Sequence, residues 1–346
     1  MSKNIDFESL QIDHRDFAEG ADEFIERMQS TDTELMRAPN ELGSCGVYVA
    51  LTDARQADGD PTVIVPRAFQ AFMEDPFEQQ RDKAIAVAMN ARVIGVDTPG
   101  VGLSRIRSRS GFDQKLEAIK GRIDTSAAAQ LLAIRSRTGL SYENEPVRYW
   151  GYSMGAWSVA AMVGSPQVFQ VEGVDLPEAV NDQPWGVVGK NGLPSKIGAE
   201  DESIDHYLEQ NFQYPELLQP YDRFSEHFRE KIPGKRLPVR MQSLLLGMGM
   251  RKPFAPGLVQ AIEADKRAGG RSGLAMAPIN LYKAEGSGVS RLEANEATAE
   301  QLRKVHPNVG FFVMRSSGFD IPLSHNFYHS VPNVAILASA IARARR

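Results

Sequence analysis

A serine stands between two glycines in the segment Gly151-Tyr-Ser153-Met-Gly155, a spacing that suits nucleophilic chemistry. Residues 147–152 are predicted to form a strand, and the small and apolar run SMGAWSVAAMVG that follows is typical of a helix packed closely on a sheet. A sharp turn from strand to helix leaves no room for side chains at the two glycines, and it projects the serine hydroxyl above the sheet. The pattern predicts that Ser153 attacks an acyl carbonyl and that the Met154 N–H stabilises the oxyanion that forms.

This motif and its flanking elements resemble the α/β-hydrolase family over roughly residues 62–174 and 278–346. A second segment, Asp97-Thr-Pro-Gly-Val-Gly-Leu-Ser104, looks like the D-x-P-G-x-G-x-S loop that follows the strand before the nucleophile in many such hydrolases. We expect Asp97 itself to have a structural role in that loop. The resemblance implies an α/β-hydrolase fold, in which helices flank a mostly parallel central sheet and a mainly helical cap is inserted into the core.

A nucleophilic serine needs a general base, and the chain has six histidines. In the family the order along the chain is nucleophile, acid and base, and the base precedes the final helix, whose start is often a proline. His325 has this spacing ahead of Pro332, so we take it as the base. His329 lies one turn away and is expected to be its neighbour. The other four histidines are interpreted as surface or cap residues: His14, His206, His227 and His306.

The acid that should orient the histidine does not occupy its usual place. Most relatives have an aspartate in the turn after the next-to-last strand, where this chain has Ser287 or Gly288. A similar turn occurs in haloalkane dehalogenases, whose acid lies at the end of the strand that follows the nucleophile. The counterpart here is Asp175, which we take as the acid, with Glu285 as the alternative. Further candidates are Glu178 and Asp320.

The second oxyanion donor normally comes from the loop after the strand predicted over residues 62–65, where relatives usually have His-Gly. This chain has Pro66-Arg-Ala-Phe69 instead. Pro66 has no N–H, so we expect the donor to be the backbone amide of Arg67 or Ala68. The charged side chain of Arg67 could point into the pocket or lie in solvent.

Apolar β-branched runs alternate with helical patterns along most of the chain, as in a parallel sheet covered on both faces. The predicted strands are residues 34–37, 46–51, 62–65, 91–97, 147–152, 169–174, 278–284 and 309–315, of which the first three suggest an antiparallel entry into the sheet. The predicted helices are residues 77–89, 124–138 and 332–345, together with the helix that begins after Ser153.

This regular pattern is lost between residues 181 and 277, where proline and glycine interrupt short amphipathic segments such as 203–212 and 221–231. We interpret residues 181–277 as a helical cap inserted into a core made of residues 1–180 and 278–346. The Met- and Leu-rich residues 241–250 could line an adaptable apolar pocket or form the cap's own core.

The composition argues against several kinds of partner. The net charge is −5 with acidic and basic residues interspersed, so the chain lacks the positive field that recruits nucleic acid or an anionic membrane. No apolar run approaches the ~18–20 residues that cross a bilayer, and residues 1–17 lack a signal-peptide pattern. The single cysteine, Cys45, has no internal disulfide partner and is expected to be a buried free thiol. We therefore expect a cytoplasmic protein with no cofactor and no metal, since no zinc motif, phosphate loop or dinucleotide fingerprint occurs.

The resemblance implies acyl chemistry, because haloalkane dehalogenases and epoxide hydrolases have an aspartate where this chain has Ser153. The leading hypothesis is a carboxylic-ester hydrolase that resembles a lipase in acting on an apolar acyl substrate. A peptidase, a thioesterase or a carbon–carbon bond hydrolase would use the same triad. A non-catalytic binding protein with the same fold is the alternative from a different class, since the His-Gly pair is missing and the acid is displaced.

Overall fold

The computed structural model describes residues 8–39, 45–67, 71, 75–100, 104–106, 114, 116–117, 120, 122–141, 145–166, 168–181, 206–207, 209–211, 213–217, 253–317 and 322–345. The strands are β1 (Glu8–Asp13), β2 (Thr33–Arg37), β3 (Cys45–Gly46), β4 (Tyr48–Asp53), β5 (Thr62–Pro66), β6 (Arg92–Val96), β7 (Arg105–Ile106), β8 (Val147–Trp150), β9 (Val171–Pro177), β10 (Ile279–Ala284) and β11 (Val309–Ser317). The helices are α1 (His14–Ala18), α2 (Ala21–Ser30), α3 (Pro76–Met89), α5 (Asp124–Thr138), α6 (Gly155–Val163), α10 (Ala255–Arg267), α11 (Leu292–Arg303) and α12 (Val331–Arg345), with 3-10 turns η2 (Pro215–Leu217) and η3 (His325–His329).

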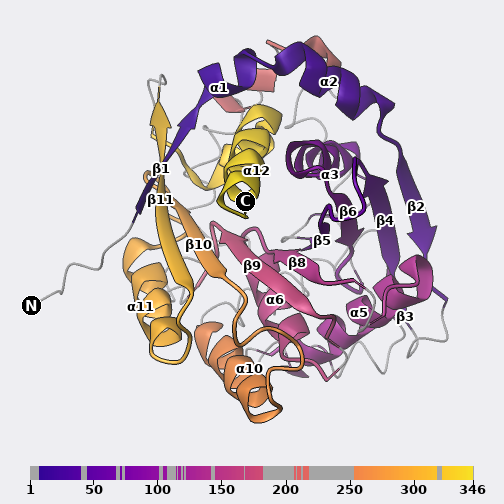
Figure 1. The fold of residues 1–346 in the computed structure, drawn as a ribbon, viewed down its shortest axis with the longest axis vertical. Coiled ribbons are helices and arrows are strands. Elements are labelled where there is room, and N and C mark those ends of the chain that lie inside the picture. Colours follow the sequence, from indigo (N-terminus) through magenta and orange to yellow (C-terminus); the bar gives the residue numbers. More distant parts are fainter. Residues whose placement is uncertain are drawn as a thin grey trace, which may run out of the picture.

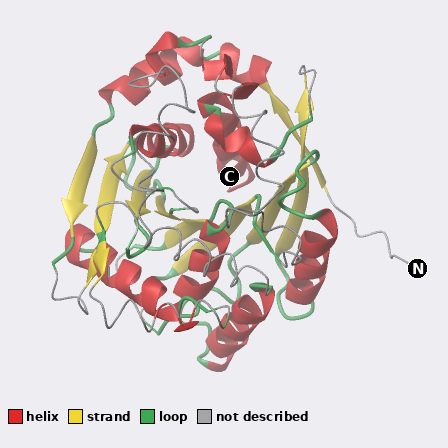
Figure 2. Ribbon diagram, turned by 180° about the vertical axis from the view of Figure 1, so that it is seen from behind, coloured by secondary structure: helices red, strands yellow, loops and turns green. Residues whose placement is uncertain are grey.

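Nine strands form one sheet in the order β1-β11-β10-β9-β8-β5-β6-β4-β2. In this order the first seven strands, which end with β6, each run parallel to the next. The last two are antiparallel, since β4 pairs antiparallel with β6 and β2 pairs antiparallel with β4. Helices lie on both sides of the curved sheet (Figures 1 and 2). The predicted mostly parallel sheet with flanking helices is confirmed. Parallel strands end at one edge of a sheet, so the loops after β5, β8, β9 and β11 converge there.

Two apolar layers hold the helices against the sheet. Buried side chains of α5, α6, α10 and α11 form the layer on one face, and those of α2, α3 and α12 form the layer on the other. All five residues of β5 are buried, as expected for a strand in the middle of a parallel sheet. Cores on both faces therefore fix the position of the strand ends.

Local sequence signals set the ends of α3, which follows β5 and lies on the same face as α12. The side chain of Asp75 accepts a hydrogen bond from the N–H of Phe77, and a proline occupies the first turn. Asn90 ends the helix with a φ angle of +49°, in the left-handed region where asparagine is tolerated. These caps fix the length of the helix that stands beside the loop after β5.

The N-terminal segment joins the two edges of the sheet, a connection that the sequence analysis does not predict. β1 pairs in parallel with β11 at one edge, and α1 and α2 then pass over α12 and α3 to β2 at the opposite edge (Figure 1). The His14 ring lies 2.6 Å from the side-chain oxygen of Asn333 on α12, which ties this segment to the last helix. Near η2, the ring of Tyr214 packs edge-on against Phe17 of α1 at 5.1 Å between centroids.

Residues 182–205 and 218–252 make up most of the predicted cap and lie outside the described residues, together with the Met- and Leu-rich residues 241–250. The extent of the cap therefore stays a prediction. The helix α10, from the last part of this stretch, packs against α6 and α11 on the core. The side chain of Cys45 also lies outside the described part of the chain.

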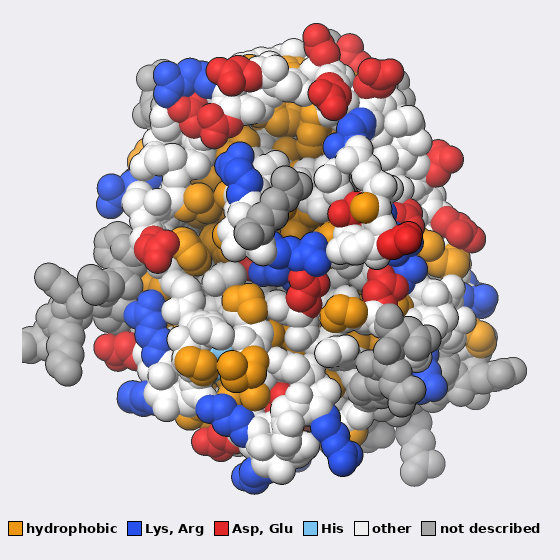
Figure 3. Space-filling view, viewed as in Figure 1, with side chains coloured by type: hydrophobic (Ala, Val, Ile, Leu, Met, Phe, Trp, Pro, Cys, Tyr) orange, Lys and Arg blue, Asp and Glu red, His pale blue; other side chains and the backbone are white. Residues whose placement is uncertain are grey.

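The surface seen in Figure 3 carries acidic and basic side chains interspersed, in keeping with the small net charge. Hydrophobic side chains are visible in a hollow below the rim formed by α1 and α2. The described residues include no helix long and apolar enough to span a membrane.

A buried ion pair links β8 to β9 in the middle of the sheet. The Nε of Arg148 lies 2.5 Å from a carboxylate oxygen of Asp175, and the two side chains are 5% and 0% exposed. The other carboxylate oxygen accepts hydrogen bonds from Asn280 at 3.0 Å and from the Tyr282 hydroxyl at 3.1 Å. A Cβ at Gly173 would lie 2.7 Å from the guanidinium carbon, so the glycine makes room for this pair.

We predict that Asp175→Asn lowers the free energy of unfolding by about 3–5 kcal/mol, because it leaves the Arg148 cation buried without a counter-charge. The amide retains hydrogen-bonding capacity toward Asn280 and Tyr282, so the loss reports the charge. The double variant Arg148→Met/Asp175→Asn should recover most of the stability, since no unpaired charge remains. Urea denaturation of the three proteins measures this, and a single variant as stable as the wild type would contradict it.

Three histidines among the described residues have a pKa lowered from its ordinary value. Burial lowers the pKa of His14 and of His306. Burial, with the positive charge of Arg81 nearby, lowers the pKa of His329 well below its ordinary value. His306 is 2% exposed, which corrects its interpretation as a surface or cap residue. A histidine whose pKa is lower in the folded state binds its proton first in the unfolded state, so acid favours unfolding.

From this sign we predict that the contribution of each histidine to stability is complete above about pH 6.5 and is lost as the pH falls below it. The loss for one histidine is at most about 1.4 kcal/mol per pH unit. Free energies of unfolding measured between pH 7.5 and pH 5.5 should fall less steeply in His329→Asn than in the wild type. His306→Asn is the matched control with a smaller change in slope. Parallel curves for the wild type and His329→Asn would refute the assignment.

Candidate active site

Ser153 stands in the sharp turn that joins β8 to α6. Its φ angle is +55°, in the left-handed region that residues other than glycine seldom adopt. A Cβ at Gly151 would come within 2.9 Å of backbone atoms of Ala156, and a Cβ at Gly155 within 2.9 Å of the carbonyl oxygen of Pro66. Both glycines are therefore required by close packing. The turn also places the serine at the N-terminus of α6, where the helix dipole favours negative charge.

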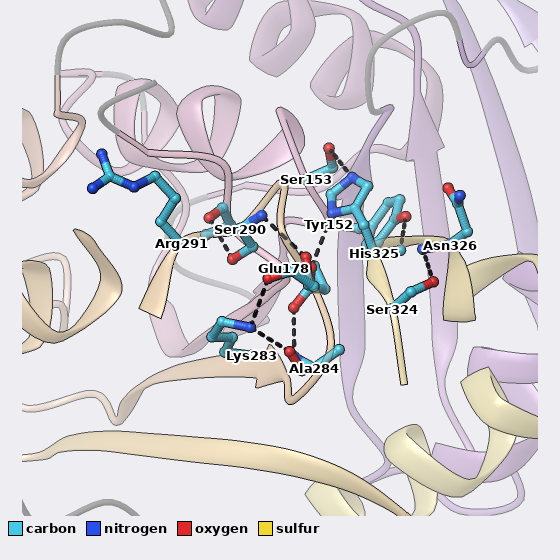
Figure 4. Close-up of polar contacts among 12 residues, drawn as sticks. Tyr152, Ser153, Glu178, Lys283, Ala284, Ser290, Arg291, Ser324, His325 and Asn326 are labelled. Atoms are coloured by element: carbon cyan, nitrogen blue, oxygen red, sulfur yellow. Dashed lines mark hydrogen bonds and ion pairs between the residues drawn. The ribbon is translucent and has the colours of Figure 1, made fainter. Parts of the chain in front are cut away.

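His325 reaches Ser153 from the far end of the chain. It is the first residue of η3, and the preceding Ser324 caps this turn by accepting a hydrogen bond from the N–H of Asn326. The Nε2 atom of His325 lies 3.0 Å from the Oγ of Ser153 (Figure 4). The two residues are 6% and 7% exposed. This distance is within the range in which an imidazole can take a proton from a hydroxyl.

The carboxylate on the other side of the imidazole belongs to Glu178. Its Oε2 atom lies 3.0 Å from the Nδ1 of His325, and its side chain is fully buried (Figure 4). Its other oxygen accepts a hydrogen bond from the N–H of Ala284, and its own N–H donates to the carbonyl of Tyr282 at 2.6 Å. Glu178 has a φ angle of +49°, so it shares with Ser153 a backbone conformation that costs free energy. An Nδ1–H that donates to Glu178 leaves Nε2 as the acceptor that faces Ser153.

The structure does not place the leading candidate acid, Asp175, against His325. The Asp175 side chain is engaged within the sheet by Arg148, Asn280 and Tyr282. Because it belongs to β9 itself, it lies before the strand end where the site is formed.

The alternative acid also binds elsewhere. The Glu285 side chain is 33% exposed and lies 4.0 Å from Arg315, and one of its oxygens accepts a hydrogen bond from the N–H of Ser316 at 3.3 Å. Asp320 lies outside the described residues. Of the three candidate carboxylates within the described residues, Glu178 is thus the one that contacts the imidazole.

The sequence held a usable signal for Glu178. The predicted strand 169–174 ends too early, because β9 continues to Pro177 and pairs there with Tyr282 of β10. Functional side chains of a parallel sheet lie just beyond the carboxyl ends of its strands. With the end of β9 placed at Pro177, Glu178 is the first carboxylate beyond it.

Among the predicted oxyanion donors, Met154 has the suitable position. It precedes α6 directly after Ser153, and within the described part of the chain no acceptor is found for its N–H. The N–H of Arg67 instead donates to the carbonyl of Val96 at 3.1 Å, which corrects its assignment as an oxyanion donor. Ala68 lies outside the described residues.

The side chain of Arg67 neither points into a pocket nor lies in solvent. It is 1% exposed and forms ion pairs with two carboxylates of α3, at 3.1 Å with Glu78 and more closely with Asp82. These opposite charges raise the pKa of the guanidinium still further above its ordinary value, although burial alone would lower it. Arg67 therefore anchors the start of the loop after β5 to α3.

A hydrogen bond joins Asp97 and Ser104, the first and last residues of the segment 97–104. The Ser104 hydroxyl donates to a carboxylate oxygen of Asp97 at 2.6 Å and accepts from the N–H of Tyr48 at 2.9 Å. The Asp97 side chain is fully buried. These contacts tie the loop to β4, as expected for a residue that supports the site without reacting.

In the ranges that the structure describes, no three histidine, cysteine, aspartate or glutamate side chains come together in a way that could hold a metal ion. At the site itself a hydroxyl, an imidazole and a carboxylate lie in hydrogen-bonded sequence. This order of groups can activate a serine as a nucleophile.

No family model matches the sequence, and no curated protein is similar to it. Solved structures are similar in fold. A bromoperoxidase from Bacillus anthracis has a TM-score of 0.53 at 14% identity, with 89% of this chain and 98% of that chain covered. DcsB, solved in complex with a substrate analogue, has a TM-score of 0.52 at 12% identity, with 91% and 98% covered. A haloalkane dehalogenase from Bradyrhizobium elkani has a TM-score of 0.51 at 12% identity, with 91% and 99% covered.

These similarities extend over almost the whole of each neighbour. At such low identity they bear on the fold and not on the reaction. The chain has the α/β-hydrolase fold.

Proposed function

We propose that the protein is a serine hydrolase that cleaves an acyl ester through the triad Ser153, His325 and Glu178. The observation that carries this proposal is the continuous line of contacts from Oγ to imidazole to carboxylate, with 3.0 Å at each of the two steps. All three side chains are buried, and where water is excluded the counter-charge of Glu178 and oriented N–H donors act more strongly on the charges that form during the reaction.

In the first half of the reaction, His325 takes the hydroxyl proton of Ser153 as the oxygen attacks the ester carbonyl. The carbonyl oxygen becomes an oxyanion that accepts a hydrogen bond from the Met154 N–H at the positive end of α6. Glu178 holds the imidazole in the tautomer that accepts at Nε2 and stabilises the imidazolium. The imidazolium then protonates the leaving alcohol, and an acyl-enzyme remains on Ser153.

In the second half, a water molecule attacks the acyl-enzyme. His325 takes a proton from this water, and a second tetrahedral oxyanion forms at the same donor. Its collapse releases the carboxylic acid and returns the proton to the Ser153 oxygen. The cycle consumes one ester and one water and yields a carboxylic acid and an alcohol, with no change of oxidation state.

The nucleophile supports acyl chemistry over dehalogenation. The resemblance drawn from the sequence implies an aspartate at the elbow for haloalkane dehalogenases, and this chain has Ser153 there. We infer an ester of an apolar acyl group as the substrate class, since residues 241–250 of the proposed cap are rich in methionine and leucine.

The direct test is hydrolysis of p-nitrophenyl esters of increasing acyl length by the wild type and by Ser153→Ala. We expect Ser153→Ala to lower kcat by about 10⁴-fold or more, because the nucleophile is removed while the fold is kept. A fluorophosphonate probe should label the wild type at Ser153 and leave the variant unlabelled. Ester cleavage that survives the substitution would count against the triad, and a wild type that binds esters without cleaving or labelling would favour a non-catalytic binder.

The identity of the acid is tested separately with Glu178→Gln. An amide in place of this carboxylate favours the wrong imidazole tautomer and leaves the imidazolium unstabilised, so we expect kcat to fall by about 10³- to 10⁴-fold. Glu285→Gln is the matched control, since it makes the same chemical change in a partly exposed side chain away from His325, and it should retain nearly full activity. Equal activity of the two variants, or loss only in Glu285→Gln, would disprove the role of Glu178.

A further inference from the structure

Tyr152, the residue before the nucleophile, contacts the catalytic histidine in two ways. Its hydroxyl donates a hydrogen bond to the main-chain oxygen of His325 at 2.6 Å. Its ring stacks on the imidazole, with 5.3 Å between centroids and 25° between planes. The Tyr152 side chain is buried, and it lies directly beside His325 in the site (Figure 4). One side chain therefore fixes the backbone of the histidine and covers its ring.

Tyr152 is itself held by a second aromatic ring. Tyr328, three residues after His325 in η3, stacks on it almost in parallel, with 3.9 Å between centroids and 9° between planes. The guanidinium carbon of Arg81 lies over the Tyr328 ring at 5.0 Å from its centroid. Because Tyr152 occupies one face of Tyr328 so closely, the guanidinium lies on the other face. The attraction between a cation and an aromatic face favours this arrangement.

Buried charges on α3 hold Arg81 in place. Glu78 forms ion pairs with Arg81 and with Arg67, and Asp82 forms a further pair with Arg67. All four charged residues are at most 5% exposed. Buried pairs of this kind contribute little to stability relative to well-packed apolar residues, so their presence next to the site favours a positioning role.

We propose that Tyr152 is a positioning residue for His325, supported by Tyr328 and Arg81. This inference rests on the proposed function of the triad. Glu178 holds one edge of the imidazole, and the Tyr152 hydroxyl holds the main chain to which the ring is attached. With both points fixed, the imidazole keeps a single orientation toward Ser153. The Tyr152 ring lies close enough to stabilise the positive charge that His325 gains when it takes the serine proton.

The test compares kcat and KM for a p-nitrophenyl ester in the wild type, Tyr152→Phe, Tyr152→Leu and Tyr282→Phe. We expect Tyr152→Phe, which loses the hydroxyl and keeps the ring, to lower kcat about 10-fold with KM within about twofold. Tyr152→Leu also loses the ring and should lower kcat about 100-fold. Tyr282→Phe removes another buried, hydrogen-bonded hydroxyl, the one that donates to Asp175, and should keep kcat within about twofold while lowering the unfolding temperature.

The graded loss of kcat at constant KM distinguishes positioning from general destabilisation. The inference is overturned if Tyr152→Phe retains full kcat, if it raises KM instead, or if Tyr282→Phe loses as much kcat. Tyr152→Phe and Tyr282→Phe decide the question even where Tyr152→Leu does not fold. A wild type that neither cleaves esters nor reacts with a fluorophosphonate would overturn the proposed function and this inference with it. An active wild type with an equally active Tyr152→Phe would overturn the inference alone.

Discussion

The hydrogen bond between the Ser153 hydroxyl and the His325 imidazole joins side chains 172 residues apart in sequence, and the arrangement of the sheet is what brings them together. Ser153 follows β8, Glu178 follows β9 and His325 follows β11, and these strands run parallel in one sheet. Two of these three residues have strained backbone conformations, with φ angles of +55° at Ser153 and +49° at Glu178. Such conformations cost about 1–3 kcal/mol each and persist only where the surrounding packing determines them. Close packing around Gly151 and Gly155 determines the conformation of Ser153. Hydrogen bonds to Ala284 and Tyr282 determine that of Glu178.

The proposed acid, Glu178, follows β9, which lies one strand closer to β8 than β10 does, whereas most α/β-hydrolases have an aspartate in the turn after the next-to-last strand. Neighbouring parallel strands end at the same edge, so a carboxylate at the end of β9 can reach the imidazole as well as one after β10. The turn after β10 retains a part in the site, because the N–H of Ala284 binds the Glu178 carboxylate. The buried ammonium of Lys283 donates to the carbonyls of Ala284 and Ser287 and so fixes the same turn (Figure 4).

Patterns that depend on local geometry were predictable from the sequence, and contacts between distant segments were not. The strand-to-helix context of Ser153 and the apolar runs of β5, β6 and β8 follow from hydrophobic periodicity and from the room available at two glycines. The choice between Asp175 and Glu178 depended on where β9 ends. The sequence predicts its end at Val174, three residues before the observed end at Pro177. The pairing of β1 with β11 depends on a partner near the other end of the chain, and the role of the Arg67 side chain depends on which carboxylates of α3 the fold turns toward it. One sequence offers no local signal for either.

Two groups of buried ion pairs lie near the site, and they differ in what they hold in place. Arg148 with Asp175, and Arg67 with Glu78 and Asp82, are both nearly inaccessible to solvent. The first group crosslinks β8 and β9 within the sheet. The second lies between the loop after β5 and the aromatic stack on His325, and it includes the counter-charge of Arg81. Desolvation costs both groups free energy that hydrophobic residues would not lose. In the proposed mechanism, the second group offsets this cost by fixing the orientation of the groups around the nucleophile.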